Sequence, residues 1–228
     1  MDILTSDFPG AHERHVLRKH NNPLFPRPLR LDDQTLFEAQ RRDFEARQAF
    51  QRDFEALLEE AVNLEQNVDT DTLLRLKGRL DEAYETACFV SGDQTAIKQA
   101  IQKLIAAIMN TLWQHIEPGD ALAQAELRQE EMARQQHFRL LETPLIADLL
   151  SPHSPIAPDE LAPTLLSADD DELRTALALF DETQLSLLVS QAKALLAPFE
   201  QRPDCPPEAW RRLEIMERAL QRPGSPAT

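Results

Sequence analysis

The sequence predicts an all-α fold with three parts: an extended basic N-terminal arm, an antiparallel bundle of long helices, and a C-terminal superhelical set of short helices. Three observations lead to this prediction. The 228 residues include only 5 Gly and many Leu, Ala, Gln, Glu and Arg, whose side chains lose little freedom in a helix. The apolar residues recur at spacings of three and four, which is the helical period. The 16 Pro fall largely between the patterned segments, at residues 9–28, 118, 144–163 and 198–226.

The predicted arm, residues 1–31, differs from the rest of the chain in charge and in proline content. Its first 30 residues hold five basic and three acidic side chains, whereas the remaining residues hold 19 basic and 36 acidic ones. Because a residue that precedes proline is biased toward extended backbone, we expect at most a short helix at residues 11–20. The positive charge predicts that the arm binds an acidic surface, on this chain or on a second copy. The candidate contact residues are Arg14, Arg18, Lys19, Arg27 and Arg30.

The first long helix is predicted to begin after an N-cap at Asp32 or Asp33 and to end at about residue 67. Its apolar stripe is thin, yet it carries several large rings, and contiguous exposed apolar groups usually mark contact sites. Two arrangements stay open: a two-fold dimer that covers the rings, or packing on the C-terminal half of the same chain. The rings concerned are Phe37, Phe44, Phe50 and Phe54, of which Phe37 and Phe44 are the candidate interaction residues.

Three further long helices complete the predicted bundle over residues 32–142. The second covers residues 72–90, and Ser-Gly-Asp at residues 91–93 ends it and begins the third, because Gly tolerates left-handed backbone and Asp is a good N-cap. The third, residues 94–116, has the strongest apolar pattern, so we expect it to form the core. The fourth covers residues 121–142. The expected centre of the core consists of Ile101, Leu104, Ile105 and Ile108.

Residues 143–200 are predicted to form three short helices, each with an acidic pair in its first turn. The pairs are Asp159-Glu160, Asp171-Glu172 and Asp181-Glu182. In this segment the pattern resembles the helical superhelix of flagellar motor switch and magnesium-transporter regulatory domains, which implies stacked short helices and no particular function. Residues 201–228 are expected to form a linker, a terminal helix from Pro207 to about Gln221, and a disordered tail.

No set of residues in the sequence indicates catalysis, a cofactor or a metal centre, so we expect the protein not to be an enzyme. A di-iron bundle needs Glu-x-x-His pairs, and the sequence has none. His12, His15 and His20 cluster in the arm without a third fixed ligand, which favours a docking role over a metal site. Cys88 is expected to be a buried small hydrophobe, since no cation close in sequence activates its thiol.

Charge and hydropathy exclude several classes of partner. A net charge of −15 disfavours binding to nucleic acid, which needs clustered Lys and Arg. No stretch approaches the ~18 apolar residues of a membrane helix, and the N-terminus lacks the pattern of a secretion signal. The two cysteines, Cys88 and Cys205, do not form a disulfide framework, so a cytoplasmic location is expected.

These observations predict a non-enzymatic bacterial adaptor, assembly factor or regulatory subunit that acts by binding another protein, either a different chain or a second copy of itself. Two other hypotheses stay open. The first is a helical protein that binds a ligand or cofactor in a pocket between bundle helices, and a polar pocket lined by the second, third and fourth long helices would favour it. The second is an acidic mimic that occupies a nucleic-acid site on its partner.

Overall fold

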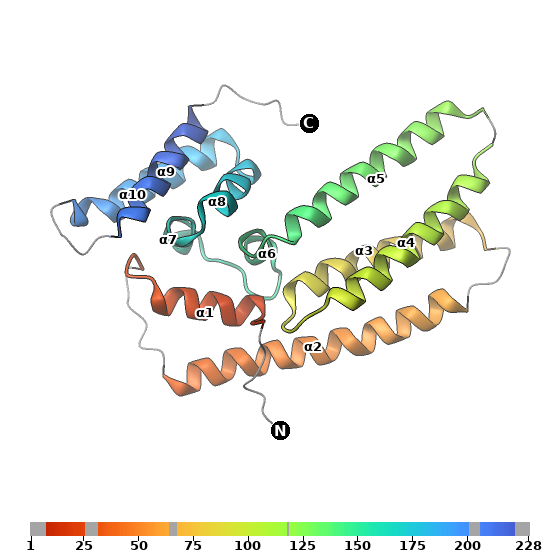
Figure 1. The fold of residues 1–228 in the computed structure, drawn as a ribbon, viewed down its shortest axis with the longest axis horizontal. Helices are drawn as coiled ribbons and strands as arrows, with labels where there is room; N and C mark the ends of the chain where they lie inside the picture. The colour runs from red at the N-terminus through yellow and green to blue at the C-terminus, as the bar shows by residue number, and fades with distance from the viewer. Residues whose placement is uncertain (1–7, 26–31, 64–67, 118, 201–205, 222–228) are drawn as a thin grey trace. The chain divides into compact units, whose positions relative to one another are not determined.

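A computed structural model describes residues 8–25, 32–63, 68–117, 119–200 and 206–221. The described residues form ten α-helices and two short 3-10 segments, and they contain no strand (Figure 1). The all-α prediction is confirmed for this part of the chain. The chain divides into two compact units: the first comprises residues 1–11 and 38–142, and the second comprises residues 12–37 and 143–228.

The first unit is built from most of α2 and from α3, α4 and α5. Helices α3 and α4 pack side by side and are joined by a tight turn, in which Gly92 has a φ of +89° (Figure 1). Helix α5 packs against α3, and Glu60 of α2 forms an ion pair with Arg79 of α3. The helices span Asp33–Val62 (α2), Thr70–Phe89 (α3), Thr95–His115 (α4) and Ala121–Leu141 (α5).

The core of the first unit lies along α4, as the sequence predicts, but one expected residue is only half-buried. Ile101 and Ile105 have no exposed surface, and Ile108 is buried beside them. Leu104 is half-buried, so the prediction that places it at the centre is wrong. The physical reason is that residues at spacings of four and seven share the inner face of α4, and Leu104 lies at the edge of that face.

The second unit combines α1 with the helices that follow α5. Helix α9 packs against α7 and α10, while α8 packs against α6 and α10. The largest fully buried side chains here are leucine, isoleucine and methionine: Leu145, Ile146, Leu165, Leu166, Leu173, Leu196 and Met216. The helices span Ala11–Asn21 (α1), Pro144–Leu150 (α6), Pro158–Ser167 (α7), Asp170–Ala176 (α8), Glu182–Leu196 (α9) and Pro207–Leu220 (α10).

The N-terminal arm differs from the extended segment that the sequence predicts. Residues 11–21 form α1, which corresponds to the short helix allowed at residues 11–20, and they belong almost entirely to the second unit. The preceding segment belongs to the first unit, where the Gly92 N–H donates to the carbonyl oxygen of Phe8 at 2.9 Å. The predicted linker at residues 201–205 and the predicted tail at residues 222–228 lie outside the described residues.

Candidate functional site

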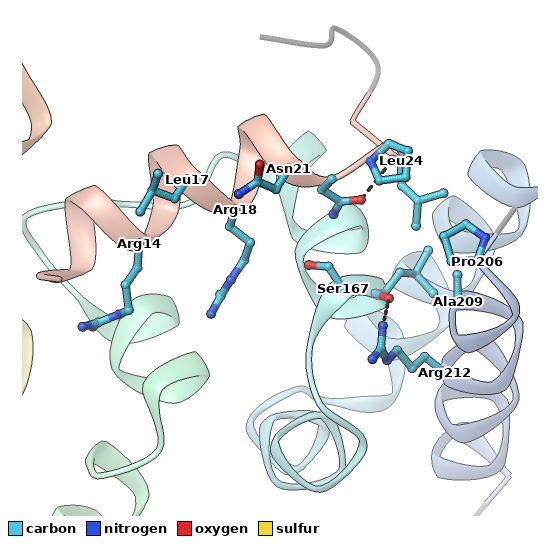
Figure 2. Close-up of a pocket in the computed structure, with 12 residues that line it drawn as sticks. Arg14, Leu17, Arg18, Asn21, Leu24, Ser167, Pro206, Ala209 and Arg212 are labelled. Atoms are coloured by element: carbon cyan, nitrogen blue, oxygen red, sulfur yellow. Dashed lines mark hydrogen bonds between the residues drawn. The ribbon is translucent and has the colours of Figure 1, made fainter. Parts of the chain in front are cut away.

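Two arginines predicted as contact residues meet a buried carboxylate of their own unit. Arg14 Nε and Nη2 each lie 2.9 Å from Asp148 Oδ1, and Arg18 Nη1 lies 3.1 Å from Asp148 Oδ2. Asp148 is on α6 and is 2% exposed. Burial raises the pKa of Asp148, and the two guanidinium groups oppose that change. Figure 2 shows the Arg14 and Arg18 side chains extending from the same side of α1.

The residues that directly follow these two arginines on α1 meet a second acidic residue, Glu160 of α7. Lys19 Nζ forms an ion pair with Glu160 Oε1, and His15 Nε2 lies 3.1 Å from Glu160 Oε2. His15 is buried, and this burial lowers its pKa, while Glu160 opposes the change. Three of the predicted contact residues are therefore engaged within the second unit, whereas Arg27 and Arg30 lie outside the described residues.

The phenylalanines of α2 do not form one continuous exposed stripe. Phe50 and Phe54 are buried and stack with ring centroids 6.2 Å apart. Phe44 is half-buried, with the Arg47 guanidinium 5.5 Å from its ring centroid. Phe37 is 48% exposed. Of the two predicted interaction residues on this helix, Phe37 is thus the more accessible one.

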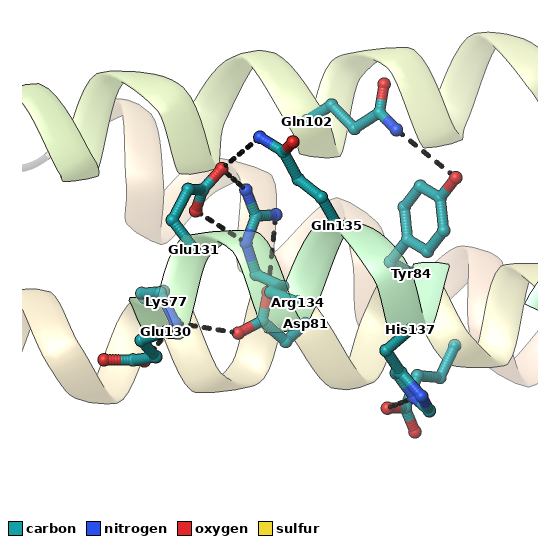
Figure 3. Close-up of polar contacts among 10 residues, drawn as sticks. Lys77, Asp81, Tyr84, Gln102, Glu130, Glu131, Arg134, Gln135 and His137 are labelled. Atoms are coloured by element: carbon teal, nitrogen blue, oxygen red, sulfur yellow. Dashed lines mark hydrogen bonds and ion pairs between the residues drawn. The ribbon is translucent and has the colours of Figure 1, made fainter. Parts of the chain in front are cut away.

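A polar pocket of about 380 Å³ lies among α3, α4 and α5 of the first unit. Tyr84 of α3 and Phe138 of α5 stack inside it with ring centroids 3.9 Å apart. The Tyr84 hydroxyl donates to Glu142 Oε1 at 3.0 Å and accepts from Gln102 Nε2 at 3.3 Å. Burial and the neighbouring carboxylate of Glu142 raise the pKa of Tyr84, so its hydroxyl stays protonated and can donate. Figure 3 shows the amide of Gln102 directed at this hydroxyl.

One wall of this pocket belongs to a network of charged side chains. Arg134 forms an ion pair with Glu131, and its guanidinium also lies 3.8 Å from Asp81 (Figure 3). Behind it, Lys77 is buried, with Nζ 3.2 Å from Asp81 Oδ2 and 2.7 Å from Glu130 Oε1. Burial alone lowers the pKa of Lys77, but hydrogen bonds to the two carboxylates outweigh it and raise the pKa. This network fixes α5 on α3.

Sequence reasoning did not single out the residues of this network. The spacing of four between Lys77 and Asp81 is a local signal that could have suggested one ion pair. The contact between Lys77 and Glu130 joins residues 53 positions apart, for which the sequence shows no local pattern. The amides and carboxylates of the pocket can hydrogen-bond a ligand, and the Tyr84-Phe138 stack provides apolar surface.

Potential metal ligands in the described residues are scattered, and the described cysteine is buried. No group of three or more His, Cys, Asp or Glu side chains in the described ranges could hold a metal ion. Cys88 is buried, and burial raises the pKa of its thiol, although Lys98 opposes the change. The expectation that Cys88 has no cation nearby holds only along the sequence, because the fold brings α4 and its Lys98 beside α3.

Helices α4 and α5 both carry exposed uncharged side chains near the pocket. Helix α4 contains two lysines and no acidic residue, and α5 contains three arginines and three glutamates. Both apolar residues on the outer face of α5 are strongly exposed, Leu122 at 71% and Met132 at 60%. The exposed uncharged residues on α4 include Gln99, Ala106 and Asn110, and those on α5 include Leu122, Ala125, Gln129, Met132, Ala133 and Gln136. We call these two sets together the α4–α5 face. The exposed charged residues are Lys103 on α4 and Glu126, Arg128, Glu130 and Arg139 on α5.

Comparison with known proteins found no matching family model, no matching curated protein and no matching solved structure. Within the part of the chain that the structure describes, no helix combines the length and the apolar character needed to cross a membrane.

Proposed function

We propose that the protein is a non-enzymatic bacterial adaptor, assembly factor or regulatory subunit that binds another protein through the α4–α5 face. The bundle arrangement, the superhelical stacking of the short helices and the cytoplasmic location belong to the same proposal. The observation that carries it is a line of exposed uncharged side chains along one side of α5 on a protein with a net charge of −15.

The composition of this face suits a protein contact. The centres of protein interfaces are depleted in charged residues, because each buried charge must be removed from water. Met132 and Leu122 are exposed, and burying them on a partner is favourable. Removing the neighbouring Ala and Gln side chains of α5 from water costs less free energy than removing Asp or Glu side chains, which are numerous in this chain.

The spacing on α5 indicates the shape of the partner. Leu122, Ala125, Gln129, Met132 and Gln136 follow each other at intervals of three, four, three and four. This spacing lines up residues along one side of a helix that lies against another helix. We therefore propose an amphipathic helix of the partner as the segment that packs on α5.

Site-specific photocrosslinking in the native host tests this proposal. A photoreactive phenylalanine analogue at Gln129 should give one dominant covalent adduct, and the same analogue at exposed Gln48 of α2 should not. Ala125→Arg together with Ala133→Arg should abolish the adduct, because two buried charges would enter the contact. An adduct of equal yield from both positions, or one that survives the two arginines, would contradict the assignment.

A ligand-binding function is the second candidate, and the polar pocket between α3, α4 and α5 favours it. Its volume of about 380 Å³ falls within the range of small-molecule sites. Ala106→Trp should fill the pocket from an exposed position on α4. Native mass spectrometry of protein from its host should show a bound molecule that this variant loses. If the spectra of the two proteins show no bound mass, the ligand hypothesis fails.

A further inference from the structure

The second unit contains a pocket of about 420 Å³ bordered by α1, the end of α7 and the start of α10. Three arginines contribute to its wall: Arg14 and Arg18 from α1, and Arg212 from α10. Figure 2 shows Arg14 and Arg18 extending from α1, and Arg212 extending from α10. None of the described residues that line the pocket is acidic, although the chain has 39 acidic and 24 basic side chains.

The acidic partners of these arginines do not form part of the wall. Asp148, which pairs with Arg14 and Arg18, is 2% exposed, and Glu172 also attracts both arginines. Asp170 lies 3.7 Å from Arg212 Nε and does not line the pocket either. These carboxylates offset the charge of the arginines and hold them in place, while the charged groups among the described lining residues are all guanidinium groups.

Two of the arginines retain donors for a ligand. A guanidinium has five N–H donors. In Arg212, Nη1 donates to the carbonyl oxygen of Leu166 at 2.9 Å, which fixes the side chain and leaves Nη2 unused (Figure 2). Arg18 interacts with Asp148 through Nη1. Planar arginine groups held in this way suit the oxygen atoms of a phosphate or a carboxylate.

The rest of the wall is mostly apolar. Leu17 and Leu24 contribute from α1 and the residues after it, Leu166 from α7, and Ala209 from α10. Apolar walls with a few convergent polar groups are typical of small-molecule sites, and the volume of the pocket lies within their usual range. The pocket thus offers an apolar surface next to a set of cationic donors.

We propose that this pocket binds a small organic anion, in which a phosphate or carboxylate group contacts Arg212 and an apolar body fills the remaining space. The site lies wholly within the second unit. It does not depend on the protein contact proposed for the α4–α5 face.

Titration calorimetry of the full-length protein tests this proposal with three probes that share one ring. Phenyl phosphate and benzoate supply the two kinds of anion, and benzyl alcohol is the neutral control. At least one anion should bind with one site per chain, and benzyl alcohol should bind far more weakly. Tighter binding of phenyl phosphate would assign a phosphate ligand, and tighter binding of benzoate would assign a carboxylate.

A matched pair of variants on α10 locates the site. Arg212→Gln should weaken binding about tenfold or more, the usual effect of losing a charge-assisted hydrogen bond. Arg211→Gln removes the same charge from the neighbouring position and also from a contact with Asp170, but Arg211 does not line the pocket. It should leave the affinity within about twofold, since an exposed charge is largely screened.

Three results would overturn the proposal: no binding of either anion at about 10 mM, equal binding of benzyl alcohol, or equal effects of the two arginine variants. If Arg212→Gln does not fold by circular dichroism, Asn21→Glu replaces it. Asn21 is exposed at the pocket, so a carboxylate there should repel both anions while Asn21→Gln should not. Unchanged affinity in Asn21→Glu would likewise overturn the proposal.

Discussion

His15 shows how a single side chain links pH to the stability of the second unit. Its imidazole is buried against Glu160, with Lys19 and His12 also acting on it. Burial and the positive charge of Lys19 lower its pKa, and the attraction of Glu160 does not fully compensate. The folded protein therefore binds a proton at His15 less readily than the unfolded chain does.

We predict that this histidine makes the second unit less stable as the pH falls. The unfolded chain takes up a proton at His15 near pH 6.5, while the folded protein does so only at a lower pH. The stability that depends on neutral His15 is thus present above pH 6.5 and is lost between 6.5 and the lower folded pKa. Urea unfolding at pH 7.5 and pH 5.5 should show a smaller loss of stability in His15→Gln than in the wild type.

The comparison has a built-in control, because the carboxylates of the second unit are the same in both proteins. His12 and His20 are retained in both proteins, so their contributions cancel in the comparison. An identical loss of stability on acidification in the two proteins would show that His15 does not carry the effect.

Two alanine substitutions on α4 compare how much a fully buried and a half-buried residue contribute to the free energy of unfolding. Ile105→Ala should cost about 2–5 kcal/mol, because it leaves a cavity at a position with no exposed surface. Leu104→Ala should cost less, since Leu104 is half-buried and water can reach part of the space. Denaturant melts measure both values, and a loss below about 1 kcal/mol for Ile105→Ala would show that α4 is peripheral.

At the scale of elements, several helices begin at an Asp side chain that caps the first turn. The Asp69 side chain accepts from the Thr72 N–H at 2.8 Å at the start of α3, and Asp181 does the same for Gln184 at the start of α9. The Asp32 carboxylate accepts from the Thr35 N–H at 2.7 Å, as the predicted cap of α2 requires. These contacts span three residues, so the sequence displays them directly.

The segment before α1 depends on a close approach that only glycine permits. A Cβ added to Gly10 would lie 2.5 Å from Asp43 Cγ in α2. We predict that Gly10→Ala displaces the segment at residues 8–10 and breaks the hydrogen bond from Gly92 to Phe8. Hydrogen exchange at the Gly92 amide should accelerate as a result.

Gly78 provides the matched control for this substitution. It is exposed in the interior of α3, and a Cβ there would meet no atom within 4 Å. Gly78→Ala should therefore stabilise the first unit by about 0.5–1 kcal/mol through helix propensity. If Gly10→Ala leaves exchange at Gly92 as slow as Gly78→Ala does, the close approach is not structurally important.

At the scale of the whole molecule, the second unit is assembled from both ends of the chain. Asp148 of α6 has two guanidinium partners from α1, and loss of α1 leaves a buried carboxylate uncompensated. Breaking a buried pair in this way typically costs about 3–5 kcal/mol. We predict that a variant lacking residues 1–30 loses amide protection in α6, α7 and α8 much more than in the core of α4.

Hydrogen-exchange mass spectrometry of this variant gives the measurement, and full-length Arg14→Met with Arg18→Met is its control. The substitutions keep the chain length and remove the same charges from Asp148, so α6 should lose protection in both proteins. Unchanged exchange in α6 would show that α1 does not stabilise the second unit. Light scattering of the same proteins also tests self-association, because a monomer in all of them excludes the two-fold dimer.

The sequence by itself determined most of the helices, because the helical period and the caps act between neighbours along the chain. It did not indicate α6, whose first turn has no acidic residue. It indicated the core face of α4, but not that Leu104 lies at its edge. It also marked Arg14, Arg18 and Lys19 as residues that bind acidic groups, without showing which groups.

Tertiary structure alone decided the partners. Arg14 and Asp148 are 134 positions apart, and the Tyr84-Phe138 stack joins α3 to α5. Neither contact has a local sequence pattern, because each joins residues far apart in the chain. It forms only when the intervening helices pack together, and that packing must offset the entropy lost in closing the chain. The pocket between α3, α4 and α5 and the arginine-lined pocket of the second unit are spaces left between packed helices. Their lining residues therefore share no pattern in the sequence.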